Sequence, residues 1–245
     1  MHADPSDQKR LLDLQRADTA LMQLTHARKN VPETETIAQL RKLINEITDK
    51  QAQHSANASD LERDISRVER EIEQVRARAQ KDRDRQLSGS ASPKELESLT
   101  QELETLARRQ SELEDHELEL MEEREQAQAA AVADDEVVAR HKEDLAATEA
   151  RLADKISQID SQLQDEQTAR TSISESLPQE LVELYERLRK RQPIAAALLR
   201  HRKCESCRIE QSGGDLAGLR AAAPGDVMRC DNCGAILVRT QESGL

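Results

Sequence analysis

Aromatic side chains are almost absent from this sequence of 245 residues. It contains one tyrosine, Tyr185, and neither phenylalanine nor tryptophan. Because aromatic residues supply much of the area that large cores bury, we do not expect a thick, multilayered core. Glycine is also scarce, and six of the seven glycines lie at or after Gly213. A composition rich in Ala, Glu, Lys, Leu, Arg and Gln with so little glycine is typical of long helices.

Long apolar runs are lacking as well. No stretch approaches the ~18 consecutive apolar residues of a membrane-spanning helix, and the N-terminal residues have no apolar signal core. We therefore expect no membrane segment and a cytoplasmic protein. In that reducing compartment, paired cysteines are metal ligands or redox groups more often than disulfides.

A net positive charge is absent from most of the chain, because acidic residues outnumber basic ones there. The net charge is −12, but residues 185–245 hold 11 basic and 7 acidic residues, while residues 1–184 hold 25 basic and 41 acidic ones. Nucleic acid would be repelled by the acidic part, whereas the C-terminal part carries no such barrier.

A heptad pattern occupies most of the acidic part. From Ile37 to Ala79 the seam positions alternate three and four residues apart, and a second seam runs from Leu96 to Leu177. The polar stretch 87–93 separates them, and Ser92-Pro93 with Glu95 reads as a helix start. Two arms of similar length joined by one turn favour an antiparallel coiled-coil helical hairpin over residues 1–184, with a break near 30–34 and its tip near 87–93.

The alternative is two independent helices that pair with another copy of the chain. Folding the chain about residue 90 places the polar seam positions Gln51 and His54 opposite Ala127–Ala131, which predicts a loosely packed middle. We interpret His54 as a tolerated polar layer. Tyr185, close to the end of the second arm, is expected to pack at the base of the hairpin.

The four cysteines form two pairs near the C-terminus. Cys204 and Cys207 are separated by two residues, as are Cys230 and Cys233, and 22 residues lie between the pairs. This spacing lets two tight turns aim four thiolates at one tetrahedral Zn²⁺, and Gly234 permits one of those turns. We expect a β zinc ribbon over residues 204–245, with strands at 226–229 and 235–239 and a helix within 215–225 capped by Asp215.

Other uses of the cysteines fit less well. A thioredoxin-type redox pair needs a βαβ context, which this region does not offer. Four cysteines can also hold an iron–sulfur cluster, but two knuckles suit zinc better. Because four thiolates leave no open coordination position, the predicted zinc is structural rather than catalytic.

A basic segment at residues 185–203 joins the hairpin to the ribbon in this interpretation. Seven cations in it are candidates for nucleic-acid or partner binding: Arg187, Arg189, Lys190, Arg191, Arg200, Arg202 and Lys203. Such a cluster beside a metal module is typical of phosphate contact. A solvated linker, or a patch that docks on the acidic arms, explains it equally well.

The whole chain resembles the bacterial C4-type zinc-ribbon proteins that carry a coiled-coil hairpin. The residues that carry the resemblance are SPKEL (92–96), LPQELVELYERLR (177–189), and CESC with RCDNCG in the ribbon. The resemblance implies that Cys204, Cys207, Cys230 and Cys233 ligate zinc. It also implies an adaptor that binds proteins, in some bacteria an alternative sigma factor or secretion components, and in some cases RNA.

No signature of an enzyme is present: there is no Gly-rich phosphate loop and no nucleophile paired with a base. We therefore expect a non-enzymatic adaptor without a small-molecule substrate, which recognises a protein through its hairpin and zinc-ribbon head. The alternative is an RNA- or DNA-binding protein that acts in transcriptional or post-transcriptional regulation. In that case the basic segment contacts phosphates and the ribbon sets its orientation.

Overall fold

The computed structural model describes residues 1–89 and 91–245, and most of them are helical. The described chain divides into two units, one of Glu35–Glu149 and one that combines Met1–Thr34 with Ala150–Leu245. The elements are α1 (Pro5–Lys29), α2 (Glu33–Leu87), α3 (Pro93–Glu175), α4 (Gln179–Arg189), β1 (Ala196–Arg200), β2 (Lys203–Cys204), α5 (Gly213–Ala221), β3 (Met228–Arg229), β4 (Ile236–Val238) and the short 3-10 helix η1 (Gln241–Ser243). No described helix has an apolar stretch long enough to cross a membrane.

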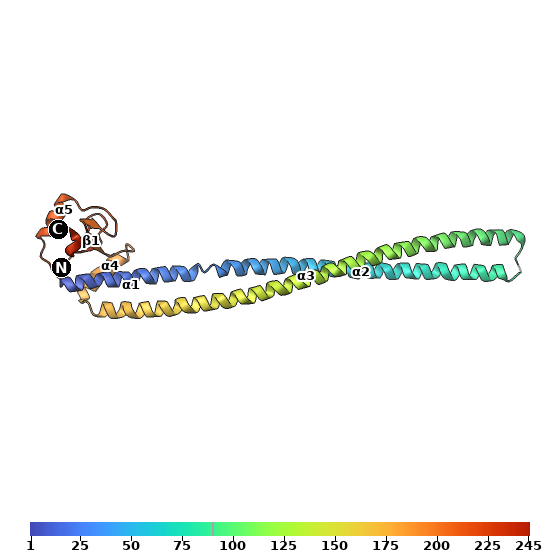
Figure 1. The fold of residues 1–245 in the computed structure, drawn as a ribbon, viewed down its shortest axis with the longest axis horizontal. Helices are drawn as coiled ribbons and strands as arrows, with labels where there is room; N and C mark the ends of the chain where they lie inside the picture. The colour runs from blue at the N-terminus through green and yellow to red at the C-terminus, as the bar shows by residue number, and fades with distance from the viewer. Residues whose placement is uncertain (90) are drawn as a thin grey trace. The chain divides into compact units, whose positions relative to one another are not determined.

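In the unit Glu35–Glu149, α2 and the first part of α3 run antiparallel (Figure 1). Their seam residues form one buried cluster, made of Leu61, Ile65, Val68, Ile72, Leu113, Leu120 and Ala127. Ion pairs flank the seam: Arg124 Nη1 lies 2.6 Å from a carboxylate oxygen of Glu62, and Arg41 Nη2 lies 2.7 Å from one of Glu149. The predicted antiparallel coiled-coil hairpin is confirmed.

The start of α3 is capped as its sequence indicates. The backbone N–H of Ser92 donates to Glu95 Oε2 at 2.7 Å, and the N–H of Glu95 donates to Ser92 Oγ at 3.4 Å. This reciprocal pair satisfies two backbone donors that a helix start leaves free. The predicted tip, 87–93, includes residue 90, which lies outside the described residues.

The polar layer in the hairpin differs from the prediction. His54 Nδ1 lies 3.0 Å from Asp134 Oδ2, about two helical turns later on α3 than a fold about residue 90 places its partner. A carboxylate partner lowers the cost of placing an imidazole at a helix interface, which alanine neighbours would not do. Ala127 and Ala131 are nevertheless buried.

The second unit begins with α1, which packs on the last part of α3. The Arg28 guanidinium binds both carboxylate oxygens of Asp160, at 2.6 and 3.2 Å. In the same unit, α1, α4 and the ribbon share one core, against which the partly buried Ile173 of α3 packs. Its buried residues are Ala3, Leu11, Leu14, Leu177, Leu181, Tyr185, Leu188, Ala195, Ala196 and Ile236. Tyr185 is buried at the base of the hairpin, as its predicted packing role requires.

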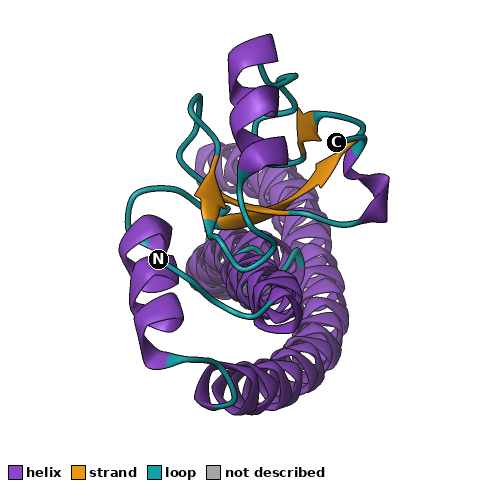
Figure 2. Ribbon diagram, turned by 90° about the vertical axis from the view of Figure 1, so that its left-hand side faces the viewer, coloured by secondary structure: helices purple, strands orange, loops and turns teal. Residues whose placement is uncertain are grey.

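The ribbon is built on a four-stranded sheet in the order β2-β1-β4-β3 (Figure 2). The outer pairs, β1–β2 and β3–β4, are antiparallel, whereas β1 and β4 are parallel, with Ala197 opposite Leu237. Helix α5 covers the sheet by burying Leu216 and Leu219 in a cluster with Leu199 and Leu237. The predicted mainly helical chain with a small C-terminal β ribbon is confirmed.

The segment 185–203, predicted as a basic linker at the base of the hairpin, consists largely of regular secondary structure. Its first residues complete α4, and Ala196–Arg200 form the strand β1, which lies inside the sheet. The apolar run of this strand is largely buried because it lies between β2 and β4, and residues 190–195 join it to α4. Helix α5 also starts earlier than expected: its N-cap is Ser212, and Asp215 completes the capping box from within the first turn.

Candidate metal centre

The first knuckle begins where β2 ends. Cys204 accepts at its carbonyl the N–H of Arg208, at 2.7 Å, and donates its own N–H to the carbonyl of Ile209, at 3.1 Å. This pair of bonds closes a tight turn around Ser206 and Cys207. Arg208 adopts a positive φ of 63°. Residues other than glycine and asparagine rarely adopt this left-handed backbone conformation.

The second knuckle repeats the same pattern between β3 and β4. Gly234 donates its N–H to the carbonyl of Cys230 at 2.7 Å, and Cys230 donates to the carbonyl of Ala235 at 2.9 Å. Gly234 has a φ of 77°, so it occupies the place that Arg208 takes in the first knuckle. The turn predicted from this glycine is present.

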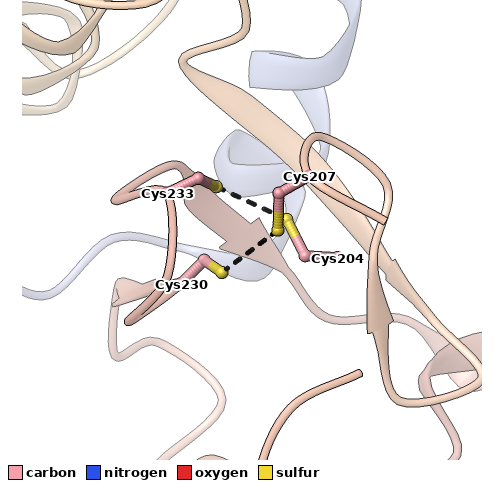
Figure 3. Close-up of side chains that lie close together, drawn as sticks. All are labelled: Cys204, Cys207, Cys230 and Cys233. Atoms are coloured by element: carbon pink, nitrogen blue, oxygen red, sulfur yellow. Dashed lines mark hydrogen bonds between the residues drawn. The ribbon is translucent and has the colours of Figure 1, made fainter. Parts of the chain in front are cut away.

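The two knuckles bring all four sulfurs together (Figure 3). Cys204 Sγ lies 3.8 Å from Cys233 Sγ, and Cys207 Sγ lies 3.8 Å from Cys230 Sγ. All four sulfur atoms lie within 4.8 Å of one another. Zn²⁺ bound to four thiolates at about 2.3 Å separates neighbouring sulfurs by about 3.8 Å. The four cysteines therefore fit one zinc ion, and the predicted single structural zinc is confirmed as the group that this site can hold.

Burial decides how the thiols titrate. Cys204 is completely buried, and burial raises its pKa to about 12, while the pKa of Cys207 is also raised, mainly by burial. Burial acts on Cys230 as well, yet the N–H groups of Cys233 and Asn232 and the Gln211 amide together hold its pKa below the ordinary value. Metal binding requires thiolates, so a bound zinc supplies the charge that keeps the buried sulfurs deprotonated.

A buried polar network holds together the helices at the hairpin base. Asp18 is fully buried, and its carboxylate accepts the hydroxyl of Tyr185 at 2.7 Å, Nε of Arg170 at 2.8 Å and Nη2 of Arg189 at 2.9 Å. Arg170 also pairs with Glu186. The carboxylate of Asp18 thus joins α1 to α3 and α4.

Gln15, one turn earlier on α1, reaches the sheet. Its Oε1 accepts the backbone N–H of Ala195 at 2.7 Å and that of Ala196 at 3.3 Å, and its Nε2 donates to the carbonyl of Pro193 at 3.1 Å. One glutamine therefore satisfies the backbone where β1 enters the sheet, at a point where no strand pairs with these groups.

The structure divides the seven cations of the predicted basic segment. Arg189 binds the buried Asp18 and so serves the fold, whereas Arg200 Nε lies 3.0 Å from Glu242 Oε2 in an exposed ion pair. Five further cations are exposed as well: Arg187, Lys190, Arg191, Arg202 and Lys203. They lie on α4 and its C-terminal turn or near β2, and they do not form one continuous stretch.

Two residues near the metal centre were not predicted. Arg239 donates to five carbonyls at the end of α5 and in the following turn, including that of Ala222 at 2.9 Å and that of Asp226 at 2.9 Å. Gln211 donates to Cys230 Sγ at 3.5 Å. Neither has a sequence signal, because an isolated arginine or glutamine in a polar stretch looks like a solvated side chain.

Comparison with known proteins agrees with both parts of the chain. Residues 14–193 match the family model of the CT398-like coiled coil hairpin domain, and residues 203–237 match that of the C4-type zinc ribbon domain. The chain is 36% identical to the protein Rv2229c of Mycobacterium tuberculosis over 241 residues, which cover 98% of each chain.

Solved structures show the same arrangement of elements. A structure from Mycobacterium smegmatis matches with a TM-score of 0.81 and 34% identity, covering 98% of this chain and 100% of that one. The structure of CT398 from Chlamydia trachomatis matches with a TM-score of 0.66 and 20% identity, covering 95% of this chain and 97% of that one. The second likeness concerns the fold alone.

Proposed function

The chain belongs to the CT398-like coiled-coil hairpin family and ends in a C4-type zinc ribbon, and on that premise we propose that it is a non-enzymatic adaptor. In this proposal the zinc ribbon and the hairpin are recognition surfaces for a protein partner. The resemblance of the sequence to zinc-ribbon adaptors favours a component of the transcription or secretion machinery as that partner.

The coordination of the metal supports a role without catalysis. A catalytic zinc keeps a position for water or substrate, whereas four thiolates complete the tetrahedron. Cys204 and Cys230, one from each knuckle, are buried. The metal would then fix the two knuckles and the surface around them, rather than act on a bound molecule.

The observation that carries the proposal is the packed junction between ribbon and hairpin base. Asp18, Tyr185 and Arg170 are linked by short hydrogen bonds across α1, α4 and α3, and Gln15 of α1 accepts the N–H groups of Ala195 and Ala196 where β1 begins. A head fixed to the base of a helical arm keeps a constant orientation toward a partner. Fixed geometry of this kind reduces the ordering cost of binding.

Exposed apolar side chains indicate where partners would be contacted. On the ribbon, Ile209 is 49% exposed beside the first knuckle. On the unit Glu35–Glu149, Leu118 is 59% exposed and Val132 is 56% exposed, both on α3 and away from the seam. Single exposed apolar residues are ordinary on protein surfaces, so these three serve as positions at which to probe for a partner.

Site-specific photocrosslinking tests the proposal. A photoreactive amino acid is placed at Ile209, at Leu118 or, as a control, at the exposed polar position Gln126, and crosslinking is done in nuclease-treated cells of the source organism. We expect one defined protein crosslinked at Ile209 or Leu118 and not at Gln126. Equal crosslinking at all three positions, or none to protein, would contradict an adaptor role.

Nucleic-acid binding is the second candidate function, and the five exposed cations favour it. Phosphate contacts made by Arg187, Lys190 and Arg191 would release counterions, so affinity would fall steeply with salt. Arg189 and Arg200 are engaged in ion pairs, so the test leaves these two residues unchanged. Neutralising Arg187, Lys190 and Arg191 together should abolish RNA binding in a filter assay, while an exposed distant change, Lys42→Gln, should leave it unchanged.

A further inference from the structure

Gln211 is a buried side chain that reaches from the first knuckle to a sulfur of the second. It is 3% exposed and follows the turn that contains Cys204 and Cys207. Its Nε2 donates to Cys230 Sγ at 3.5 Å and to the carbonyl of Ile209 at 3.3 Å. Its backbone N–H donates to the carbonyl of Arg202 at 2.9 Å, which fixes the residue beside β2.

Cys230 stands apart from Cys204 in this respect. Both sulfurs belong to buried cysteines, and backbone N–H groups of its own knuckle point at each. Cys230 receives in addition a side-chain donor that comes from the other half of the ribbon. Four thiolates around one Zn²⁺ carry excess negative charge, and a donor aimed at a buried sulfur compensates part of it.

The placement of Gln211 has a mechanical consequence too. A sulfur of the second knuckle is held by the metal and by a side chain anchored on the first knuckle. The Gln211 amide is therefore a second connection between the halves, positioned by the carbonyl of Ile209 and by the backbone bond to Arg202.

We propose that Gln211 is a positioning residue of the zinc centre, which orients the Cys230 thiolate and lowers its reactivity. It acts through Cys230 and does not touch the metal. Loss of the outer partner of a metal ligand commonly weakens metal retention by about 10–100-fold. The proposal holds whether the protein acts as an adaptor or binds nucleic acid.

The test compares Gln211→Met with Gln8→Met. Gln8 is a matched control, because it is 2% exposed and its Nε2 donates to the carbonyls of Ala3 and Pro224, away from the sulfurs. Zinc release from the full-length protein to a chromogenic chelator is the first measurement. We expect Gln211→Met to release zinc about tenfold faster and Gln8→Met to change the rate less than twofold.

The second measurement is alkylation with iodoacetamide, followed by peptide mass spectrometry of the zinc-loaded protein. We expect the share of modification at Cys230 to rise in Gln211→Met, and the order among the other three cysteines to be kept. An unchanged release rate in Gln211→Met would overturn the proposal. Equal acceleration in both variants would also overturn it, because a general loss of stability would then be the cause.

A measurement on the unaltered sequence covers the case in which Gln211→Met does not fold. In protein loaded with ¹¹³Cd²⁺, the side-chain amide protons of Gln211 should shift downfield relative to other glutamines and exchange slowly with water. Amide protons of Gln211 at ordinary positions with rapid exchange would show that no bond to sulfur exists, and would refute the assignment.

Discussion

The buried carboxylate of Asp18 offers the sharpest test of what joins the helices at the hairpin base. Replacing Asp18 by Asn keeps the shape of the side chain but removes its charge and replaces one acceptor oxygen by a donor. That carboxylate accepts bonds from Tyr185, Arg170 and Arg189, so the variant places an NH₂ group against at least one donor. Two guanidinium groups then lose their main counterion in a largely buried site.

The expected cost follows from the burial of these partners. Removing one member of a buried ion pair costs about 3–5 kcal/mol. The side chains of Arg170 and Arg189 remain 15% and 32% exposed, and water there offsets part of the loss. We therefore expect Asp18→Asn to lower the free energy of unfolding of this unit by about 2–3 kcal/mol. With an m value of about 2 kcal/mol/M, the urea midpoint falls by more than about 1 M.

The assay uses a probe that the composition provides. Tyr185 is the single aromatic residue of the chain, so tyrosine emission during urea unfolding reports on this site alone. Asp13→Asn is the matched control on the same helix, because Asp13 pairs with Arg16 on the exposed face and such pairs contribute less than about 1 kcal/mol. Equal midpoints for the two variants would refute the role assigned to Asp18.

Three further predictions concern the tyrosine, the knuckles and the metal. Burial, and then Asp18, raise the pKa of Tyr185 far above its ordinary value, so the folded state keeps a proton that the unfolded state loses above about pH 10. The free energy of unfolding should therefore fall by about 1.4 kcal/mol per pH unit above that pH. Absorbance at 295 nm should show tyrosinate only as the protein unfolds, and titration of Tyr185 near pH 10 in folded protein would contradict this. Arg208→Gly should stabilise the zinc-loaded protein by about 1 kcal/mol, because Arg208 holds a left-handed φ. Gly234→Ala should destabilise it by at least as much. Thermal unfolding checks both, because the melting temperature should shift in opposite directions in the two variants. Removing zinc with a chelator should expose Cys204 and Cys230 to alkylation while tyrosine emission stays that of buried Tyr185, and loss of both signals together would show that the metal holds the base as well.

Periodic features of this chain were predictable, because they depend on near neighbours. The heptad seams specify a face on each helix without reference to the rest of the fold. The spacing of Cys204-Cys207 and Cys230-Cys233 likewise specifies two local turns, and zinc chemistry brings them together. The N-terminal cap of α3 at Ser92 was predictable too, because a capping box depends on residues only three positions apart.

The strand β1 was missed because its state is decided far away. Ala196, Ala197, Leu198 and Leu199 have no β-branched side chains, and alanine and leucine favour helices. They form a strand because the first three pair with Ile236–Val238, about forty residues later in the chain, while Leu199 pairs with Cys204. Tertiary pairing thus overrides the local preference, and a segment interpreted as a basic linker becomes an interior strand.

The charges were misjudged for a related reason. Arg189 looked like one of several interchangeable cations, and Asp18 like one acid among many on an acidic arm. Only the antiparallel register brings Asp18 of α1 beside Arg170 of α3, and only the return of α4 adds Tyr185 and Arg189. Sequence composition reports how many charges there are, whereas burial determines which of them serve the fold.

The metal and the buried network therefore stabilise different parts of the same head. Zinc would hold the knuckles that flank β2, β3 and β4, which are two or three residues long and too short to persist alone. The inner strand β1 is held from the other side, because Gln15 binds the N–H groups of Ala195 and Ala196 and Ile236 packs in the core of α1 and α4. Loss of zinc should consequently release the outer faces of the ribbon before the junction. In the adaptor role that we propose, removal of zinc would therefore abolish partner recognition by the ribbon while the hairpin remains folded.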